Sequence, residues 1–322
     1  MVVGAGLAGL VAATELAATR RTVLVDKGRG PGGRLATRRI GEAVFDHGAQ
    51  FLTARDPDFL RLVQRLGAEG VAVPWFDRLP SDAVGTPERT RFRGAPGMNA
   101  VAKALAAALD VRCSAQVASV AAEGGRWRIA LVDGSTIHSS SVLLTSPVPQ
   151  SLALLDAGAV VLAPGDRRSL EAVTYDPCLA VLAALEGPSG LAAPGARRPE
   201  HPDLGWVADN RAKGISPVPA VTLHASADYS RDHFDAPEDD VVAALLGAAE
   251  LASAPVAGST QLVRWRYAKP ARLHAEPFLA AQGLPALLFA GDGFGGPRVE
   301  GAWASGQAVA RHLLASRPAG TA

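Results

Sequence analysis

The sequence predicts an α/β fold in which a domain with a parallel sheet is joined to a second domain with a mixed, mostly antiparallel α+β sheet. A strand–turn–helix–strand pattern at the start of the chain predicts the parallel sheet, and a buried strand with a long helix after residue 285 returns to it. Between residues 150 and 283, Pro-rich loops separate short runs such as AVTLHAS and TQLVRWRY, which favours antiparallel strands. The 322 residues are enough for two such domains.

The first element is a glycine-rich turn. Gly4, Gly6 and Gly9 in MVVGAGLAGL form the pattern G-x-G-x-x-G, and only three residues precede it, so the predicted first strand is short. In such turns the first glycine permits the tight bend, the second lets backbone N–H groups approach a pyrophosphate, and the third lets the helix pack on the sheet. A helix predicted over residues 7–19 adds the partial positive charge of its N-terminus. The turn therefore predicts a dinucleotide site.

The next strand, predicted over residues 22–28, contains Asp26 at its end, where a carboxylate accepts hydrogen bonds from ribose hydroxyls. The loop that follows, GRGPGGRLATRR, is too rich in glycine for regular structure. Its arginines can face a pyrophosphate, or they can simply form a solvated basic loop. These arginines are Arg29, Arg34, Arg38 and Arg39.

The remaining elements are predicted from periodicity and from the positions of Gly and Pro. Apolar residues at helical spacing predict helices over residues 57–70 and 97–109. Alternation on both sides of Glu123-Gly124-Gly125 predicts a hairpin over residues 116–135, and SVLLTSP at 141–147 predicts a strand that stops at proline.

The C-terminal segment decides between NAD and a flavin. AGDGFGGPRVEGAWASG places Asp292 just after a buried strand and Gly301 at the start of a helix. Asp292 can hold a ribityl hydroxyl, and the helix N-terminus can face the N1–C2=O edge of a flavin, where it stabilises negative charge on the reduced ring. NAD requires no such second site, so the two glycine-rich segments together favour FAD.

Composition and charge exclude several classes of function. The formal net charge of +1 gives no reason to expect nucleic acid or an acidic membrane surface as a partner. Cys113 and Cys178 lie far apart without a Cys/His cluster, which argues against a structural zinc site or a disulfide scaffold and fits a reducing cytosol. No stretch is long and apolar enough to predict a membrane span. We expect a cytoplasmic protein without a metal.

Several segments carry a family resemblance through their order along the chain. They are the Gly4–Gly9 turn, DKGRGPGGRLATRR, FDHGAQFLTARD, PGMNAVAKAL, the hairpin near Val117, GWVADNRAKG, LHASADYSR, RWRYAKPA and RVEGAWASGQAVA. Over almost the whole chain they resemble the flavin-containing amine oxidase superfamily, and within it the renalase-like bacterial proteins. That family often has a Trp-Cys pair after the Gly-Asp of its C-terminal motif, whereas this chain has Gly293-Phe294.

The resemblance implies an FAD-binding Rossmann-type domain, similar to that of glutathione reductase, and a substrate domain as in flavin amine oxidases. Residues 1–56, 94–150 and 284–322 would form the first, and residues 57–93 and 151–283 the second. FAD would be bound noncovalently by residues of the matching motifs, with Val117 contributing its backbone near the adenine. These residues are Gly4, Gly6, Leu7, Ala8, Gly9, Asp26, Lys27, Gly33, Arg34, Gln50, Val117, Gly291, Asp292, Arg298, Val299, Glu300, Gly301 and Ala302.

The resemblance also implies an activity. Bacterial renalases oxidise the 2- and 6-dihydro isomers of NAD(P)H to NAD(P)+ and pass the electrons to O2 as hydrogen peroxide. The expected partners are a small-molecule substrate, either a dihydronicotinamide nucleotide or an amine, and O2. An amine oxidase or related desaturase, and a flavin-binding protein without activity, stay open as alternatives.

Hydride transfer to flavin N5 requires mainly the correct position of the donor, so we expect no catalytic triad. Aromatic and polar residues should wall the pocket, although each of them can also belong to the core. His224, for example, can be a satisfied buried histidine or can orient a carboxamide. The candidates are Gln50, Phe51, Thr53, Trp206, His224, Tyr229, Trp265 and Tyr267.

Overall fold

The computed structural model describes residues 1–80, 82 and 87–315. The predicted domain ranges 57–93 and 284–322 extend over residues outside this description. The chain divides into two compact units: unit 1 comprises Met1–Gly33, Ala102–Thr174 and Pro270–Ala322, and unit 2 comprises Arg34–Val101 and Tyr175–Lys269. The predicted assignment of residues to a cofactor domain and a substrate domain stays a prediction.

Unit 1 is built around a six-stranded sheet. Its spatial order is β17 (Leu279–Ala280), β18 (Leu287–Phe289), β11 (Val142–Leu144), β1 (Val2–Val3), β2 (Val23–Val25) and β7 (Asp110–Arg112). All neighbours are parallel except β17 and β18. The predicted short first strand has two residues, yet it lies inside the sheet, because Val2 pairs with Leu143 on one side and with Leu24 on the other.

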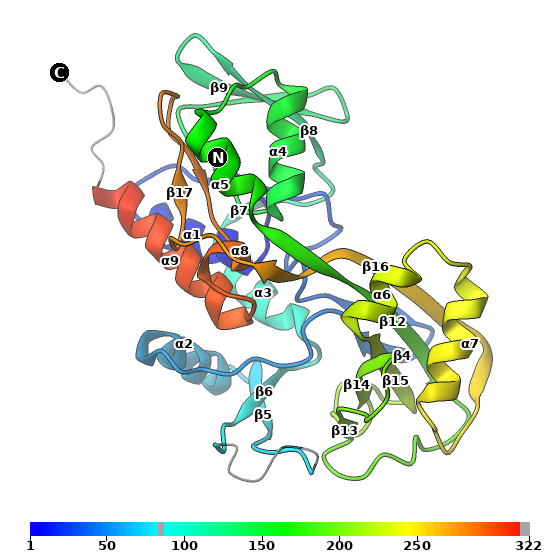
Figure 1. Ribbon diagram of the computed structural model, residues 1–322. Coiled ribbons are helices and arrows are strands. Elements are labelled where there is room, and N and C mark those ends of the chain that lie inside the picture. Colours follow the sequence, from blue (N-terminus) through cyan, green and yellow to red (C-terminus); the bar gives the residue numbers. More distant parts are fainter. Residues whose placement is uncertain (81, 83–86, 316–322) are drawn as a thin grey trace. The chain divides into compact units, whose positions relative to one another are not determined.

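Helices cover this sheet, and two of them bring residues 7–17 and 299–315 into contact. Helix α1 (Leu7–Ala17) follows β1, and α9 (Val299–Ala315) packs along it (Figure 1). The contact is close, since a Cβ atom on Gly306 would lie 2.5 Å from the carbonyl oxygen of Ala8. The other helices of unit 1 are α4 (Val148–Ala157), α5 (Pro164–Glu171) and α8 (Asp292–Gly295).

The predicted hairpin of unit 1 is confirmed and carries a third strand. Strand β8 (Val117–Glu123) pairs antiparallel with β9 (Arg126–Leu131), and β9 pairs with β10 (Thr136–Ser139). Gly124 and Gly125, in the turn between β8 and β9, both have positive φ angles, which explains why glycines stand there.

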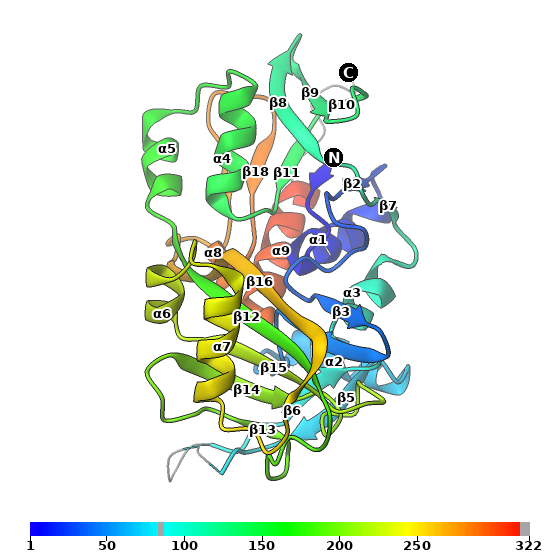
Figure 2. The ribbon, with the colours of Figure 1, turned by 90° about the vertical axis from the view of Figure 1, so that its right-hand side faces the viewer.

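Unit 2 contains the predicted antiparallel sheet. Its spatial order is β13 (Ala196–Arg197), β14 (Leu204–Asp209), β15 (Ala220–Ala225), β12 (Thr174–Leu185) and β16 (Pro255–Arg272). Side chains alternate between its two faces. On one face, Leu223 packs with α6 (Ala227–Asp232) and α7 (Glu238–Ala248), and Figure 2 shows α7 lying along the sheet.

The opposite face of this sheet receives the hairpin of β3 (Thr37–Ile40) and β4 (Ala43–Asp46). Phe45 of β4 is fully buried against Leu182 and Ala220 of the sheet. We call this side the polar face, because His224, Thr222 and Trp206 belong to it. The hairpin positions the loop that follows β4. This loop contains the candidate pocket residues Gln50, Phe51 and Thr53.

The predicted helices near residues 57–70 and 97–109 are confirmed as α2 (Pro57–Ala68) and α3 (Asn99–Ala106). Asp56 caps α2 by accepting the backbone N–H groups of Asp58 and Phe59, and a buried apolar stripe follows the helical period. Strands β5 (Ala72–Phe76) and β6 (Arg91–Gly94) form a separate pair. In the part of the chain that the structure describes, no helix is long and apolar enough to cross a membrane.

Candidate functional site

Glycine occupies each of the three positions of the first turn for a different structural reason. Gly4 has a φ of +108°, and a Cβ atom there would lie 2.5 Å from Thr145 Oγ1. A Cβ atom on Gly9 would lie 2.1 Å from the carbonyl oxygen of Gly4, so α1 packs on the turn through bare backbone. A Cβ atom on Gly6, by contrast, would meet nothing within 4 Å. The space in front of Gly6 is therefore open to a ligand.

Helix α1 begins beside this open space. Gly6 is its N-cap residue and supplies no side chain to cap the first turn. The first N–H groups of an α-helix lack partners within the helix, and the helix dipole makes this end positive. The arrangement at Gly6 fits a pyrophosphate, as the sequence predicts.

Asp26 is fixed toward the same turn. Its Oδ2 accepts the backbone N–H of Ala5 at 2.7 Å, and its Oδ1 accepts that of Gly28 at 2.7 Å. A carboxylate oxygen can accept two hydrogen bonds, so each oxygen retains a lone pair. The carboxylate is thus held in place and can still accept ribose hydroxyl groups.

Two further predicted cofactor residues of unit 1 lie near the turn. The backbone N–H of Ala115 donates to the carbonyl of Asp26 at 2.9 Å, which brings Val117, two residues later, close to the end of β2. The backbone N–H of Gly32 donates to Ala5, and a Cβ atom on Gly33 would lie 3.5 Å from the Cα atom of Gly6.

The C-terminal segment reaches the same edge of the sheet. Strands β1, β2, β11 and β18 are parallel, so their carboxyl ends share one edge, which is where α/β sheets bind ligands. Gly291 follows β18 with a φ of +137°, and Asp292 begins α8. Gly301 is the third residue of α9, and a Cβ atom on it would lie 2.3 Å from the carbonyl of Gly296. Predicted residues of this segment are Gly291, Asp292, Arg298, Val299, Glu300, Gly301 and Ala302.

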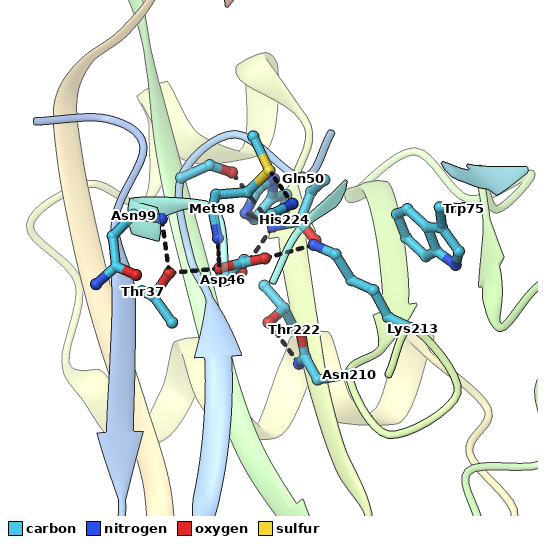
Figure 3. A network of polar contacts seen from close by, with 12 residues as sticks. Thr37, Asp46, Gln50, Trp75, Met98, Asn99, Asn210, Lys213, Thr222 and His224 are labelled. Atoms are coloured by element: carbon cyan, nitrogen blue, oxygen red, sulfur yellow. Dashed lines mark hydrogen bonds and ion pairs between the residues drawn. The ribbon is translucent and has the colours of Figure 1, made fainter. Parts of the chain in front are cut away.

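Unit 2 contains a buried polar network centred on Asp46, the last residue of β4 (Figure 3). Its Oδ1 accepts Thr37 Oγ1 at 2.6 Å and the backbone N–H of Met98 at 2.8 Å. Its Oδ2 accepts Lys213 Nζ at 2.7 Å, and both side chains of this ion pair are fully buried. Asp46 is therefore held from three different segments of the chain.

Burial affects the basic side chains of this network. Burial lowers the pKa of Lys213, Asp46 opposes this, and the nearby Arg93 lowers it further. Burial also lowers the pKa of Arg93. The ammonium group of Lys213 lies 4.9 Å from the ring centroid of Trp75, whose π face partly balances the charge.

Gln50 is oriented by this network. Its Nε2 donates to the carbonyl oxygens of Asp46 at 2.6 Å and Gly48 at 3.2 Å, and lies 3.5 Å from His224 Nε2. Because both acceptors are carbonyls, the amide cannot be turned the other way. The carbonyl oxygen Oε1 of Gln50 is buried and has no hydrogen-bond partner among the described residues.

Two histidines of this region are kept neutral. Burial lowers the pKa of His47 to about 4, and the charges of Arg38 and His224 contribute to this. Burial likewise lowers the pKa of His224 to about 4, although a hydrogen bond with the His47 backbone opposes the shift. The Trp265 ring stacks on His47 with centroids 5.3 Å apart, and its Nε1 donates to the His47 carbonyl at 2.9 Å.

Aromatic residues complete this cluster. Trp206 stands directly opposite His224 across β14 and β15. Its ring centroid lies 5.6 Å from that of Phe51. The structure therefore brings five of the predicted pocket residues together: Gln50, Phe51, Trp206, His224 and Trp265.

The other candidates lie elsewhere in unit 2. Tyr229 belongs to the core on the opposite face of the sheet, where its ring stacks on His233 at 4.1 Å. The Tyr267 ring contacts Tyr175, and its carbonyl accepts a hydrogen bond from Arg34 Nη1 at 3.3 Å. Thr53 follows Leu52, which pairs with Phe92.

Sequence reasoning missed Asp46, Lys213, Arg93, Trp75 and His47 as members of the site. No local signal separated Lys213 from the other three lysines of this arginine-rich chain, Lys27, Lys103 and Lys269, which are exposed.

Comparison with known proteins places the chain among flavin enzymes. Residues 2–66 match the family model described as NAD(P)-binding Rossmann-like domain, and residues 75–314 match that of flavin containing amine oxidoreductase. The chain is 25% identical to renalase of Mus musculus, covering 97% of this chain and 98% of the mouse protein.

Solved structures share the fold at lower identity. The crystal structure of a proposed protoporphyrinogen oxidase from Exiguobacterium sp. 255-15 matches with a TM-score of 0.71 and 14% identity, covering 97% of each chain. A putrescine oxidase double mutant matches with a TM-score of 0.69 and 16% identity, covering 98% of each chain. These matches confirm the predicted combination of a Rossmann-like domain with an antiparallel domain.

Proposed function

Because the chain belongs to the flavin-containing amine oxidoreductase family, we propose that it is an FAD-dependent oxidase of the 2- and 6-dihydro isomers of NAD(P)H. In this reaction the dihydronicotinamide becomes NAD(P)+, and O2 becomes hydrogen peroxide. The end-to-end similarity to mouse renalase is the observation that carries the proposal, together with the renalase-like order of motifs in the sequence.

The residues of unit 1 fit FAD. The open space at Gly6 and the uncapped first turn of α1 would receive the pyrophosphate, and Asp26 would accept the ribose hydroxyls. Asp292 and the start of α9 would serve the ribityl chain and the ring. Bound FAD would supply a hydride acceptor at N5 and return the electrons to O2.

The residues of unit 2 favour a neutral ring over an amine. His47 and His224 are neutral at neutral pH, and the carboxylate of Asp46 already pairs with Lys213. Asp46 is therefore not available to pair with a protonated amine, whereas a dihydronicotinamide ring carries no charge and needs no such partner. The amine oxidase alternative therefore has less support from this site.

Anaerobic reduction of the bound flavin tests the proposal. The purified protein should show the two-band spectrum of oxidised flavin, or acquire it after FAD is added. Isomerised NADH should then bleach this spectrum rapidly, whereas ordinary NADH, as a control, and a set of amines should not. In air, the same reaction should produce hydrogen peroxide.

Other outcomes would assign the protein differently. Bleaching by amines alone would indicate an amine oxidase, and bleaching by neither class would indicate a flavin-binding protein without turnover. A protein that stays colourless after incubation with FAD would refute the whole assignment.

A further inference from the structure

Two side chains next to His224 on the polar face of unit 2 have a buried polar atom without a hydrogen-bond partner among the described residues. They are Gln50, through the acceptor Oε1, and Trp206, through the donor Nε1. Buried polar groups in proteins are nearly always paired. An unpaired acceptor and an unpaired donor around one histidine therefore indicate a ligand that offers both a donor and an acceptor.

The acceptor is fixed in its orientation. The NH2 group of Gln50 donates to the Asp46 and Gly48 carbonyls, so only the carbonyl oxygen of the side chain can face a ligand. Asp46 itself cannot shift, because Thr37, Met98 and Lys213 all donate to its carboxylate. Lys213 and Asp46 thus act as positioning residues for Gln50.

The donor is fixed by the sheet. Trp206 lies opposite His224 in the register of β14 and β15, so their side chains are neighbours on one face. Its ring also packs against Phe51, the residue after Gln50. An indole N–H can only donate. Gln50 and Trp206 each keep 7% of their surface exposed, so both side chains lie at the border of the buried region rather than deep inside it.

We propose that Gln50 and Trp206 recognise the primary carboxamide of the dihydronicotinamide ring. Gln50 Oε1 accepts an N–H of the carboxamide, and Trp206 Nε1 donates to its carbonyl oxygen. The inference rests on the proposed function, because that function supplies a substrate with a carboxamide. A primary ammonium group offers donors only and would leave Trp206 unpaired, and a carboxylate would place a negative charge against the Gln50 oxygen.

Ligand binding to the FAD-loaded protein tests this inference without turnover. NAD+ and 3-acetylpyridine adenine dinucleotide, in which a methyl ketone replaces the carboxamide, are titrated while the flavin absorbance is followed. The Gln50→Met variant should bind NAD+ about tenfold more weakly and the acetylpyridine analogue as the wild type does, because only NAD+ offers the N–H. The Trp206→Phe variant should weaken both ligands equally, because both retain the carbonyl.

Trp127→Phe is the matched control. Trp127 lies in β9 of unit 1, outside the polar face, and its Nε1 already donates to the Ala286 carbonyl at 3.2 Å. Its replacement should leave both dissociation constants unchanged. If Gln50→Met does not fold, Trp206→Phe decides the question, and equal binding by this variant and the wild type would overturn the inference.

The remaining outcomes separate the inference from the proposed function. A Gln50→Met variant that loses FAD affinity yet keeps the wild-type preference for NAD+ would assign the Gln50 oxygen to the flavin and overturn the inference. So would a wild-type protein that binds neither nucleotide. A protein that is not reduced by dihydro isomers, yet prefers NAD+ through Gln50, would refute the proposed function and support the carboxamide site.

Discussion

Asp46 is the residue that connects the polar network of unit 2. Its carboxylate accepts three hydrogen bonds, and its backbone carbonyl holds the amide of Gln50. The ion pair with Lys213 is completely buried. Such pairs contribute little net stability compared with apolar residues of equal size, but breaking one partner is costly. The pair therefore favours a role in positioning over a role in stability.

Replacing Lys213 should show how costly it is to lose one partner of this buried ion pair. In Lys213→Met the carboxylate of Asp46 stays buried without its counter-ion, so the free energy of unfolding should fall by about 3–5 kcal/mol. Denaturant unfolding with a constant FAD concentration measures the change. The double variant Asp46→Asn/Lys213→Met should recover part of the loss, because the buried carboxylate that lost its ion-pair partner is no longer present. A single variant as stable as the wild type would contradict the prediction.

The two buried histidines predict a pH dependence of stability. Each has a pKa of about 4 in the folded protein and 6.5 in an unfolded chain, so between these values the unfolded chain binds protons that the folded protein does not. Their contribution is complete above pH 6.5 and is lost as the pH falls toward 4, at about 1.4 kcal/mol per pH unit for each histidine.

His224→Gln tests this dependence. The variant lacks one of the two groups, so its unfolding free energy should decrease less steeply than that of the wild type between pH 6.5 and pH 4. Urea midpoints at several pH values give both slopes. Parallel slopes would show that His224 does not titrate differently in the folded and unfolded states.

At the scale of single elements, two glycines of the turn between β1 and α1 have different roles. Gly9 is needed for packing, whereas Gly6 is needed for the proposed binding of FAD. Gly6→Ala adds a methyl group into open space, so the unfolding temperature without FAD should stay unchanged while FAD affinity falls at least about tenfold. Gly9→Ala drives a methyl group into the Gly4 carbonyl and should destabilise the protein itself, by about 1–3 kcal/mol or more. Thermal unfolding followed by FAD titration distinguishes the two effects. Equal behaviour of both variants would contradict this division.

Elements with a local signal could be predicted from the sequence. Helix α1 was found from the spacing of Leu7, Leu10 and Val11 and from the glycines before it, and the hairpin of β8 and β9 from alternation around Gly124. Asp26 was found because a βαβ unit places its second strand end at a regular distance from the glycine turn.

The interactions that complete the site had no such signal. Asp46 and Lys213 are 167 residues apart, and only the antiparallel sheet of unit 2 brings them together. Tyr229 was expected in the pocket, yet Ser226 begins α6 by accepting the Tyr229 N–H, and this helix directs Tyr229 into the core of the opposite face. A serine at an N-cap is a local signal that could have separated Tyr229 from the pocket residues.

At the scale of the whole molecule, the two cysteines predict a cofactor that is not covalently attached. Burial raises the pKa of Cys178 to about 12, and burial together with Asp26 raises that of Cys113. Both pKa values thus lie further above neutral pH than that of an ordinary thiol, which disfavours attack of either cysteine on a flavin. Acid denaturation should release all the yellow flavin into the supernatant, and flavin retained in the pellet would contradict this.

The position of β1 inside its sheet has a consequence for folding during synthesis. β1 acquires one neighbour early, from β2, but the other is β11, and α1 receives its partner α9 only from residues 299–315. The first half of unit 1 therefore leaves the ribosome with an open sheet edge and an uncovered helix. Such distant pairings fold slowly and favour aggregation. The edge of the sheet at which we propose that FAD binds is completed only after nearly the whole chain has been made.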